Sequence, residues 1–134
     1  MLNSHRECFI CGPENPRGLE VRFLPDGAGV QAEYTVSLVY QGYPGVVQGG
    51  IVSALLDSAM TNCLGARGVE AMTARLEVRF HHPVETGRPL RIIAREEGSR
   101  GRIYRLTAAI EQDKQIKASA SGVFLPGRSG KSLK

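Results

Sequence analysis

The amino-acid sequence predicts an α+β fold in which one long helix is wrapped by a curved antiparallel sheet of five to six strands. A strongly apolar segment with the periodicity of a helix begins near residue 49, and segments with the alternation typical of half-buried strands lie on both sides of it. The turns between the later segments are short, and a curved sheet is the simplest way to bury such a helix. A chain of 134 residues fits one domain, which we place at residues 1–126.

The part of the chain before the helix is predicted to form two strands joined by a hairpin turn. Residues 19–24 follow a turn-rich stretch and alternate apolar with polar side chains. Asp26 and Gly27 are a hairpin turn signal, and residues 30–36 are the expected partner strand.

The helix is predicted to begin at Gly49 and Gly50 and to end near Gly65 and Gly68, which are typical stop signals. Its apolar face recurs every three to four residues and consists of Ile51, Val52, Leu55, Leu56, Ala59, Met60, Cys63 and Leu64. No second helix is expected, because four strands with short turns follow, at residues 73–80, 90–96, 102–110 and 116–125.

The composition restricts the class of protein. Apolar residues make up 42% of the chain, and it has neither a membrane-length apolar run nor a signal-peptide pattern, so we expect a cytoplasmic protein without a membrane partner. Tyr and Phe are few and Trp is absent, which disfavours nucleic acid as a partner. The net charge of +4 fits an anionic ligand, but equally a protein without one. The basic tail at residues 127–134 is predicted to be disordered.

The three cysteines suit a reducing compartment and do not make a disulfide framework. Cys8 and Cys11 have a spacing seen in zinc sites, and His5 lies three residues before Cys8. Three ligands do not close a structural zinc site, however, and Cys63 belongs to the apolar face of the helix. We therefore expect no metal, and we interpret the Cys8 and Cys11 pair as packing near the N-terminal strand.

Asp57 is the one formal charge among the 33 residues from Tyr34 to Ala66. An ionised carboxylate is costly to bury in an apolar helix, so this side chain either lies on an exposed polar stripe or serves a purpose in a cleft. Its small hydroxylic neighbours on the helix fit both interpretations: they are Ser53, Ser58 and Thr61.

The helix start, Gln48-Gly49-Gly50, is a second candidate feature. Two glycines let the backbone come close to a ligand, and the unpaired N–H groups of a helix N-terminus favour an oxygen that carries negative charge. A thioester carbonyl becomes such an oxygen during hydrolysis. The alternative is a loop-to-helix turn that needs glycine for its geometry alone.

Together these features resemble a known family. The run GYPGVVQGGIVSALLDSAM at residues 42–60 closely resembles the signature of the phenylacetate-pathway (PaaI-like) thioesterases of the hotdog fold, in which His-Gly-Gly is followed on the helix by Asp. The resemblance covers nearly the whole chain, to about Leu125, and includes Cys8-Phe9-Ile10-Cys11-Gly12, Asn15-Pro16, Gly18-Leu19, Val78-Arg79-Phe80, His82-Pro83-Val84 and Gly87.

The resemblance implies a hotdog fold and hydrolysis of an acyl-CoA thioester, with coenzyme A as part of the substrate and no separate cofactor. It implies that Asp57 is the general base or nucleophile, that the Gly49 N–H polarises the thioester carbonyl, and that Thr73 positions the attacking water. The remaining residues expected to line the substrate site are Gly50, Tyr43, Ser58 and Thr61. Strand alternation, by contrast, places Thr73 on the same face as Arg75, Glu77 and Arg79, where it would be a surface residue.

The sequence departs from the family at Gln48, where relatives usually carry His. Glutamine donates and accepts hydrogen bonds but does not titrate. Gln48 therefore substitutes for the histidine if that residue only orients the loop or the substrate. If proton transfer is needed, the chain is instead a non-catalytic acyl-CoA-binding protein. The Asp and His pattern of hotdog dehydratases is not found here.

Helix geometry predicts a homodimer or a dimer of dimers. Asp57 lies eight residues beyond Gly49, which is about 12 Å along the helix axis. One thioester carbonyl cannot contact both residues of the same helix, so the acid is expected to come from a second, antiparallel helix.

Overall fold

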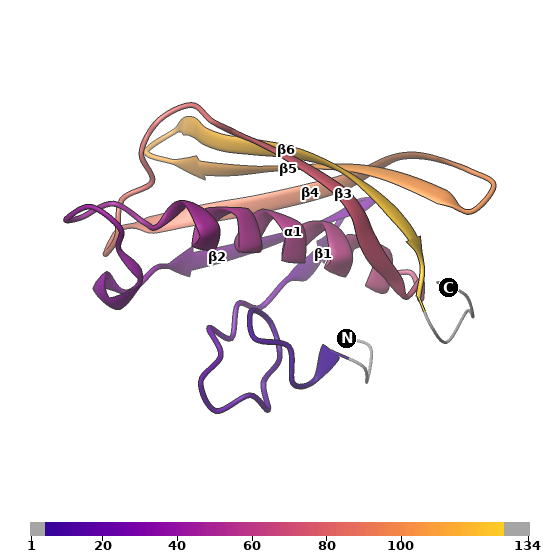
Figure 1. Ribbon diagram of the computed structural model, residues 1–134, viewed down its shortest axis with the longest axis horizontal. Coiled ribbons are helices and arrows are strands. Elements are labelled where there is room, and N and C mark those ends of the chain that lie inside the picture. Colours follow the sequence, from indigo (N-terminus) through magenta and orange to yellow (C-terminus); the bar gives the residue numbers. More distant parts are fainter. Residues whose placement is uncertain (1–4, 128–134) are drawn as a thin grey trace.

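In the part of the chain that the structure describes, one α-helix, α1, lies across one face of a curved antiparallel sheet of six strands (Figure 1). The computed structural model describes residues 5–127, so the tail that we predicted to be disordered lies almost entirely outside the described residues. The elements in chain order are β1 (Leu24–Asp26), β2 (Gly29–Thr35), η2, a 3-10 turn (Leu38–Tyr40), α1 (Gly49–Gly65), β3 (Ala71–Phe80), β4 (Pro89–Arg100), β5 (Ile103–Gln112) and β6 (Gln115–Pro126). The predicted α+β architecture is confirmed.

The strand order in the sheet is β1-β2-β4-β5-β6-β3, so β1 and β3 are its two edges. Short hairpins join β1 to β2, β4 to β5 and β5 to β6, whereas α1 lies between β2 and β3 in the chain. The helix therefore carries the chain from one side of the sheet to the other, and within the described residues β3 pairs with β6 alone.

The core lies between α1 and the sheet face that it covers. Leu55, Leu56, Met60 and Leu64 of the helix are fully buried. Their partners across the interface include the fully buried Ile92, Ile110 and Phe124 of the sheet. This confirms the apolar face that the helical periodicity predicted, and the helix ends at Gly65 as expected.

The predicted strand at residues 19–24 is wrong, because only Leu24 of this segment belongs to β1. Residues 19–21 bond to the N-terminal segment instead: Leu19 N–H donates to the Phe9 carbonyl (2.9 Å) and Val21 N–H to the Ile10 carbonyl (2.8 Å). Between them, Glu20 has a positive φ of 55°, which interrupts an extended strand. The apolar and polar alternation is satisfied because Val21 is fully buried against the core.

Candidate functional site

The N-terminus of α1 is capped by the side chain of Gln48. The Gln48 Oε1 atom accepts hydrogen bonds from the Gly50 N–H (2.6 Å) and the Ile51 N–H (3.2 Å). A Cβ on Gly50 would lie 2.8 Å from this oxygen, so glycine at position 50 leaves room for the cap. The residue that replaces the usual histidine therefore has a local structural role that an amide oxygen fulfils.

The Gly49 N–H is left without a hydrogen-bond partner among the described residues of the chain. The next three amides of the first turn, by contrast, all donate to Gln48, through its side chain or its carbonyl. Gly49 is exposed, and the ring of Phe80 lies 3.8 Å from the position of a Cβ added there. An open amide at the positive end of a helix is a site for a carbonyl oxygen that gains negative charge.

A groove of about 580 Å³ lies beside this amide. Its buried floor is apolar and consists of Val47, Val52 and Val84. The remaining lining residues are Gly42, Tyr43, Val46, Gln48, Gly49, Phe80, His81, His82 and Pro83. Tyr43, which the family resemblance predicts to line the substrate site, is one of these residues. The sequence alone gave no reason to expect Phe80 or the two histidines here, because they lie at the end of a distant strand. The imidazole of His81 bonds Ser119 Oγ (2.9 Å), and that of His82 bonds the Gln115 side chain (3.0 Å).

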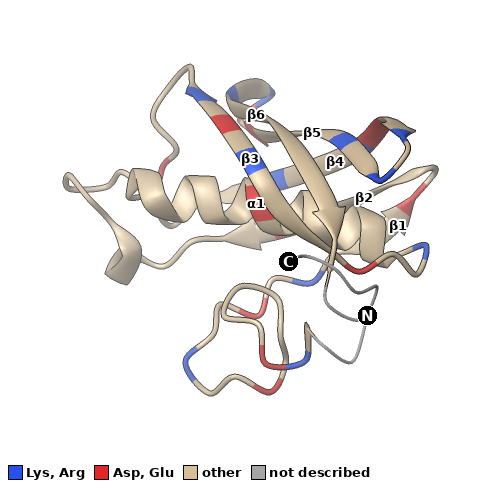
Figure 2. Cartoon of the chain, turned by 45° about the vertical axis from the view of Figure 1, so that its right-hand side comes forward, with Lys and Arg blue, Asp and Glu red and all other residues tan. Residues whose placement is uncertain are grey.

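Asp57 and Thr73 form a second cluster farther along the helix. The Thr73 hydroxyl donates a hydrogen bond of 2.6 Å to Asp57 Oδ1. Asp57 is half-buried, and Figure 2 shows α1 as almost free of charge along its length. A hydrogen bond of this length to a carboxylate fixes one oxygen and leaves the other free to accept a proton.

Thr73 reaches Asp57 because of a β-bulge in β3. Thr73 pairs with Phe124 and Arg75 with the adjacent Val123, so Ala74 is the extra residue. The bulge moves Thr73 to the helix side of the sheet, the side of the fully buried Phe124 ring. The simple alternation that placed Thr73 with Arg75, Glu77 and Arg79 on the outer face is therefore wrong.

The hydroxylic residues of α1 near Asp57 lie on two different sides of the helix. One turn before and one turn after it, the Ser53 and Thr61 hydroxyls donate to the carbonyls of Gly49 (3.1 Å) and Asp57 (3.0 Å). Ser58 lies apart from this stripe: it is buried, and its carbonyl accepts a hydrogen bond from Asn62 (2.9 Å). Asn62 also donates to the Cys11 sulfur (3.3 Å), so Ser58 lies beneath the N-terminal segment.

The structure thus divides the predicted site into two halves. Gln48, Gly49, Gly50 and Tyr43 lie together at the start of the helix, and Asp57, Thr73 and Thr61 lie together two turns later. Asp57 lies eight positions after Gly49 in the helix, which is about 12 Å along the axis.

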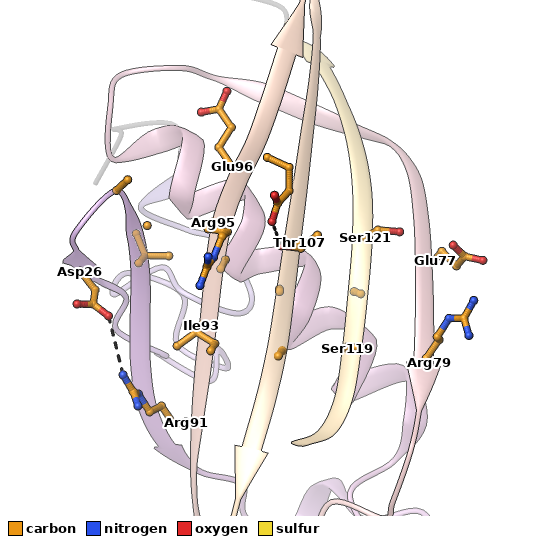
Figure 3. A pocket seen from close by; sticks show the side chains of 18 residues that line it. Asp26, Glu77, Arg79, Arg91, Ile93, Arg95, Glu96, Thr107, Ser119 and Ser121 are labelled. Carbon is orange, nitrogen blue, oxygen red and sulfur yellow. Dashed lines mark hydrogen bonds and ion pairs between the residues drawn. The ribbon is translucent and has the colours of Figure 1, made fainter. Parts of the chain in front are cut away.

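Two other regions carry polar residues but no comparable arrangement. No three His, Cys, Asp or Glu side chains within residues 5–127 gather as metal ligands. Burial raises the pKa of the Cys63 thiol above its ordinary value, which keeps this thiol protonated. A larger hollow of about 740 Å³ lies on the outer face of the sheet, away from α1 (Figure 3). Its charged residues include Asp26 and Arg91, 3.9 Å apart, and the hollow contains none of the predicted site residues.

Within the described part of the chain, no helix is both long and apolar enough to cross a membrane.

Comparison with known proteins shows which family the chain is similar to. The chain is 29% identical over 87 residues to the acyl-coenzyme A thioesterase THEM4 of Bos taurus; the match covers 63% of this chain and 35% of THEM4. A thioesterase superfamily protein of known crystal structure is 30% identical, with a TM-score of 0.85 over 90% of this chain and 63% of that one. The chain therefore spans only about a third of THEM4 and less than two thirds of this structural relative.

The fold is also that of the PaaI protein from the phenylacetic acid degradation operon of E. coli. That protein has a TM-score of 0.74 and 18% identity, and the match covers 80% of this chain and 83% of that one. The sequence pattern of the thioesterase superfamily itself matches residues 44–118, which is more than half of the chain and includes the helix and every residue of the two half-sites except Tyr43. The chain belongs to the thioesterase superfamily.

Proposed function

We propose that this protein hydrolyses an acyl-CoA thioester to the free acid and coenzyme A. The observation that carries the proposal is the pair of half-sites on one helix. One is the Gly49 amide, which has no hydrogen-bond partner within residues 5–127 and lies beside a groove with an apolar floor; the other is the Asp57 carboxylate, which accepts a hydrogen bond from Thr73. The similarity to THEM4 supports acyl-CoA as the class of substrate. Coenzyme A is then part of the substrate, and no separate cofactor is needed.

The chemistry assigns one task to each half-site. The thioester carbonyl accepts a hydrogen bond from the Gly49 N–H, which stabilises the negative charge that develops on its oxygen. Asp57 either takes a proton from a water molecule as that water attacks the carbonyl carbon, or attacks this carbon itself and is released by water. The carbon–sulfur bond breaks in both routes and coenzyme A leaves as its thiolate. The water molecule that is consumed supplies the hydroxyl of the free acid and the proton that converts the thiolate to the thiol. Thr73 holds the carboxylate in position.

The proposed enzyme is a homodimer, alone or as a dimer of dimers. The distance of about 12 Å along the helix is too long for one carbonyl to contact the Gly49 amide and the Asp57 carboxylate of the same chain. An antiparallel helix of a second subunit supplies the missing half, and two-fold symmetry then yields two equivalent sites. We expect the groove that is lined by Tyr43 and Phe80 to hold substrate atoms next to the thioester.

Gln48 favours a second candidate function, that of a protein that binds acyl-CoA without hydrolysing it. Its amide oxygen is occupied by the cap of α1, and it supplies no titratable group beside Gly49. Under this alternative the groove holds the ligand, but the rate of hydrolysis is negligible.

Release of free thiol from short-chain, medium-chain and aryl acyl-CoAs separates the two functions. The proposed enzyme turns over at least one of these esters, and Asp57→Asn lowers the rate by about 100-fold or more while circular dichroism shows an intact fold. Binding by calorimetry without release of thiol would establish the second function. Turnover that is the same in wild type and Asp57→Asn would remove Asp57 from the mechanism.

A further inference from the structure

Two of the three cysteines lie close together in the N-terminal segment, the indigo loop of Figure 1, and the proposed reaction does not use them. The Gly12 N–H donates to the Cys8 carbonyl (2.9 Å), which closes one helical turn that includes Cys11. The turn is tight, because a Cβ on Gly12 would collide with the backbone nitrogen of Cys8. Residues three apart in a helical turn have Cα atoms about 5 Å apart, within the range of about 4.4 to 6.8 Å that a disulfide requires.

The sulfur of Cys8 is directed toward Cys11. It accepts hydrogen bonds from the Ile10 N–H (3.4 Å) and the Cys11 N–H (3.5 Å). Backbone hydrogen bonds from Leu19 and Val21 to the two residues between the cysteines hold the turn in place (2.9 and 2.8 Å). The fold therefore keeps the two side chains next to each other, and rotation about their own bonds is enough to bring the sulfurs together.

The two thiols differ in their access to solvent. Cys8 is half-buried, whereas Cys11 is 4% exposed and its sulfur accepts a hydrogen bond from the Asn62 side chain of α1 (3.3 Å). Cys11 also lines a hollow of about 680 Å³, which leaves its side chain room to turn toward Cys8. A reagent from solvent therefore meets Cys8 first, and Cys11 is placed to react second.

We propose that Cys8 and Cys11 form a reversible disulfide by exchange with a low-molecular-weight disulfide such as glutathione disulfide. The Cys8 thiolate attacks one sulfur of glutathione disulfide, which forms a mixed disulfide on Cys8 and releases one glutathione. The Cys11 thiolate then attacks the Cys8 sulfur, which forms the bond between the two cysteines and releases the second glutathione. Two protein thiols are oxidised to one disulfide and glutathione disulfide is reduced to two thiols, so electrons and protons balance.

The pair is connected to α1 through Asn62. The Nδ2 atom of Asn62 donates to the Cys11 sulfur (3.3 Å) and to the Ser58 carbonyl (2.9 Å). Ser58 directly follows Asp57 in the helix. Closing the disulfide moves the Cys11 sulfur toward Cys8 and changes its contact with Asn62, so oxidation should shift the amide resonances of Asn62 and Ser58 in NMR spectra. Unchanged resonances would overturn this connection to the helix.

Mass spectrometry of the intact chain after incubation with glutathione disulfide tests the order of the two steps. The wild type should lose two hydrogen atoms without gaining glutathione, and peptide mapping should place the bond between Cys8 and Cys11. Cys11→Ser cannot complete the second step and should accumulate one glutathione on Cys8. Cys8→Ser retains only buried thiols and should react about tenfold more slowly or less. Cys63→Ala is the matched control, because it leaves the pair intact and should react like the wild type.

The wild type alone supplies a second test that does not depend on the folding of a variant. Mixtures of oxidised and reduced glutathione give the equilibrium constant between the disulfide and the two thiols, in buffer and in urea. The closed turn should raise this constant by about tenfold or more in the folded protein. A constant no higher than in urea, a wild type without a bond between Cys8 and Cys11, or glutathione on Cys11 in place of Cys8 would overturn the proposal. None of these measurements uses turnover, so their outcome is independent of the proposed function.

Discussion

At the scale of single residues, the hydrogen bond between Thr73 and Asp57 is the feature that most favours a catalytic role for Asp57 over a purely structural one. Among the described residues, Asp57 has no cationic partner within 4.0 Å. The Thr73 hydroxyl is the one side chain of these residues that donates a hydrogen bond to its carboxylate. Thr73 is exposed and makes no contribution to the core. A residue in such a position can be changed with little effect on the fold.

Replacing Thr73 with Val tests its role as a positioning residue. The change removes the hydroxyl and keeps the shape, so the loss of a hydrogen bond to a carboxylate should lower kcat by about tenfold and leave the free energy of unfolding within about 0.5 kcal/mol. Thr73→Ser is the matched control and should retain most of the activity. Equal activity in Thr73→Val and wild type would show that the bond does not orient the reacting group.

Gln48 and Gly50 should be energetically coupled through the helix cap. Gln48→Ala removes the cap and should lower the free energy of unfolding by about 0.5 to 2 kcal/mol. When Gln48 is present, the methyl group of Gly50→Ala displaces the Gln48 side chain. In the Gln48→Ala background there is no such side chain, and Gly50→Ala should raise the free energy of unfolding by up to about 1 kcal/mol through its higher helix propensity. Urea denaturation of both single variants and the double variant measures the coupling. Additive effects would mean that the Gln48 oxygen does not occupy the position seen beside Gly50.

At the scale of elements, the sequence predicted what depends on local patterns and missed what depends on long-range pairing. The helix was predictable because its apolar face repeats along a single segment, ending at Gly65. The side of the sheet on which Thr73 lies was not, because it depends on one extra residue, Ala74, in the pairing of β3 with β6. Residues 19–24 alternate like a strand, but they bond to the N-terminal segment instead of the sheet.

The segment at residues 19–24 is also held in place by the Tyr34 hydroxyl, which donates a hydrogen bond to the Leu19 carbonyl (2.7 Å). Burial is the main reason why the pKa of Tyr34 is raised above 10 in the folded protein, with smaller contributions from Tyr40 and Glu20. In the unfolded chain the Tyr34 hydroxyl loses its proton at about pH 10. The contribution of the protonated hydroxyl to the free energy of unfolding is therefore complete below pH 10, and it is lost as the pH rises through the pKa of Tyr34 in the folded protein.

Tyr34→Phe should therefore lower the free energy of unfolding by about 0.5 to 1.5 kcal/mol at pH 8. The difference between wild type and variant should shrink when both are measured above pH 10, in urea titrations at the same ionic strength. A difference that grows with pH would contradict the raised pKa of Tyr34.

At the scale of the whole molecule, the proposed enzyme requires two chains to share each active site. One helix carries both Gly49 and Asp57, and its length keeps them apart. In the proposed dimer, two antiparallel helices bring the amide of one subunit to the carboxylate of the other. A single chain should therefore have negligible activity, however well it folds.

Complementation between two inactive variants tests this claim most directly. Gly49→Pro removes the amide at the first position of α1, where proline is tolerated, and Gln48 already has the extended backbone that precedes proline (φ −61°, ψ 137°). Asp57→Ala removes the carboxylate. In a mixed dimer, one of the two sites combines an intact Gly49 from one subunit with an intact Asp57 from the other, so random mixing of equal amounts should restore about a quarter of the wild-type rate of thiol release. Mixed dimers that form and yet release no thiol would contradict the shared site.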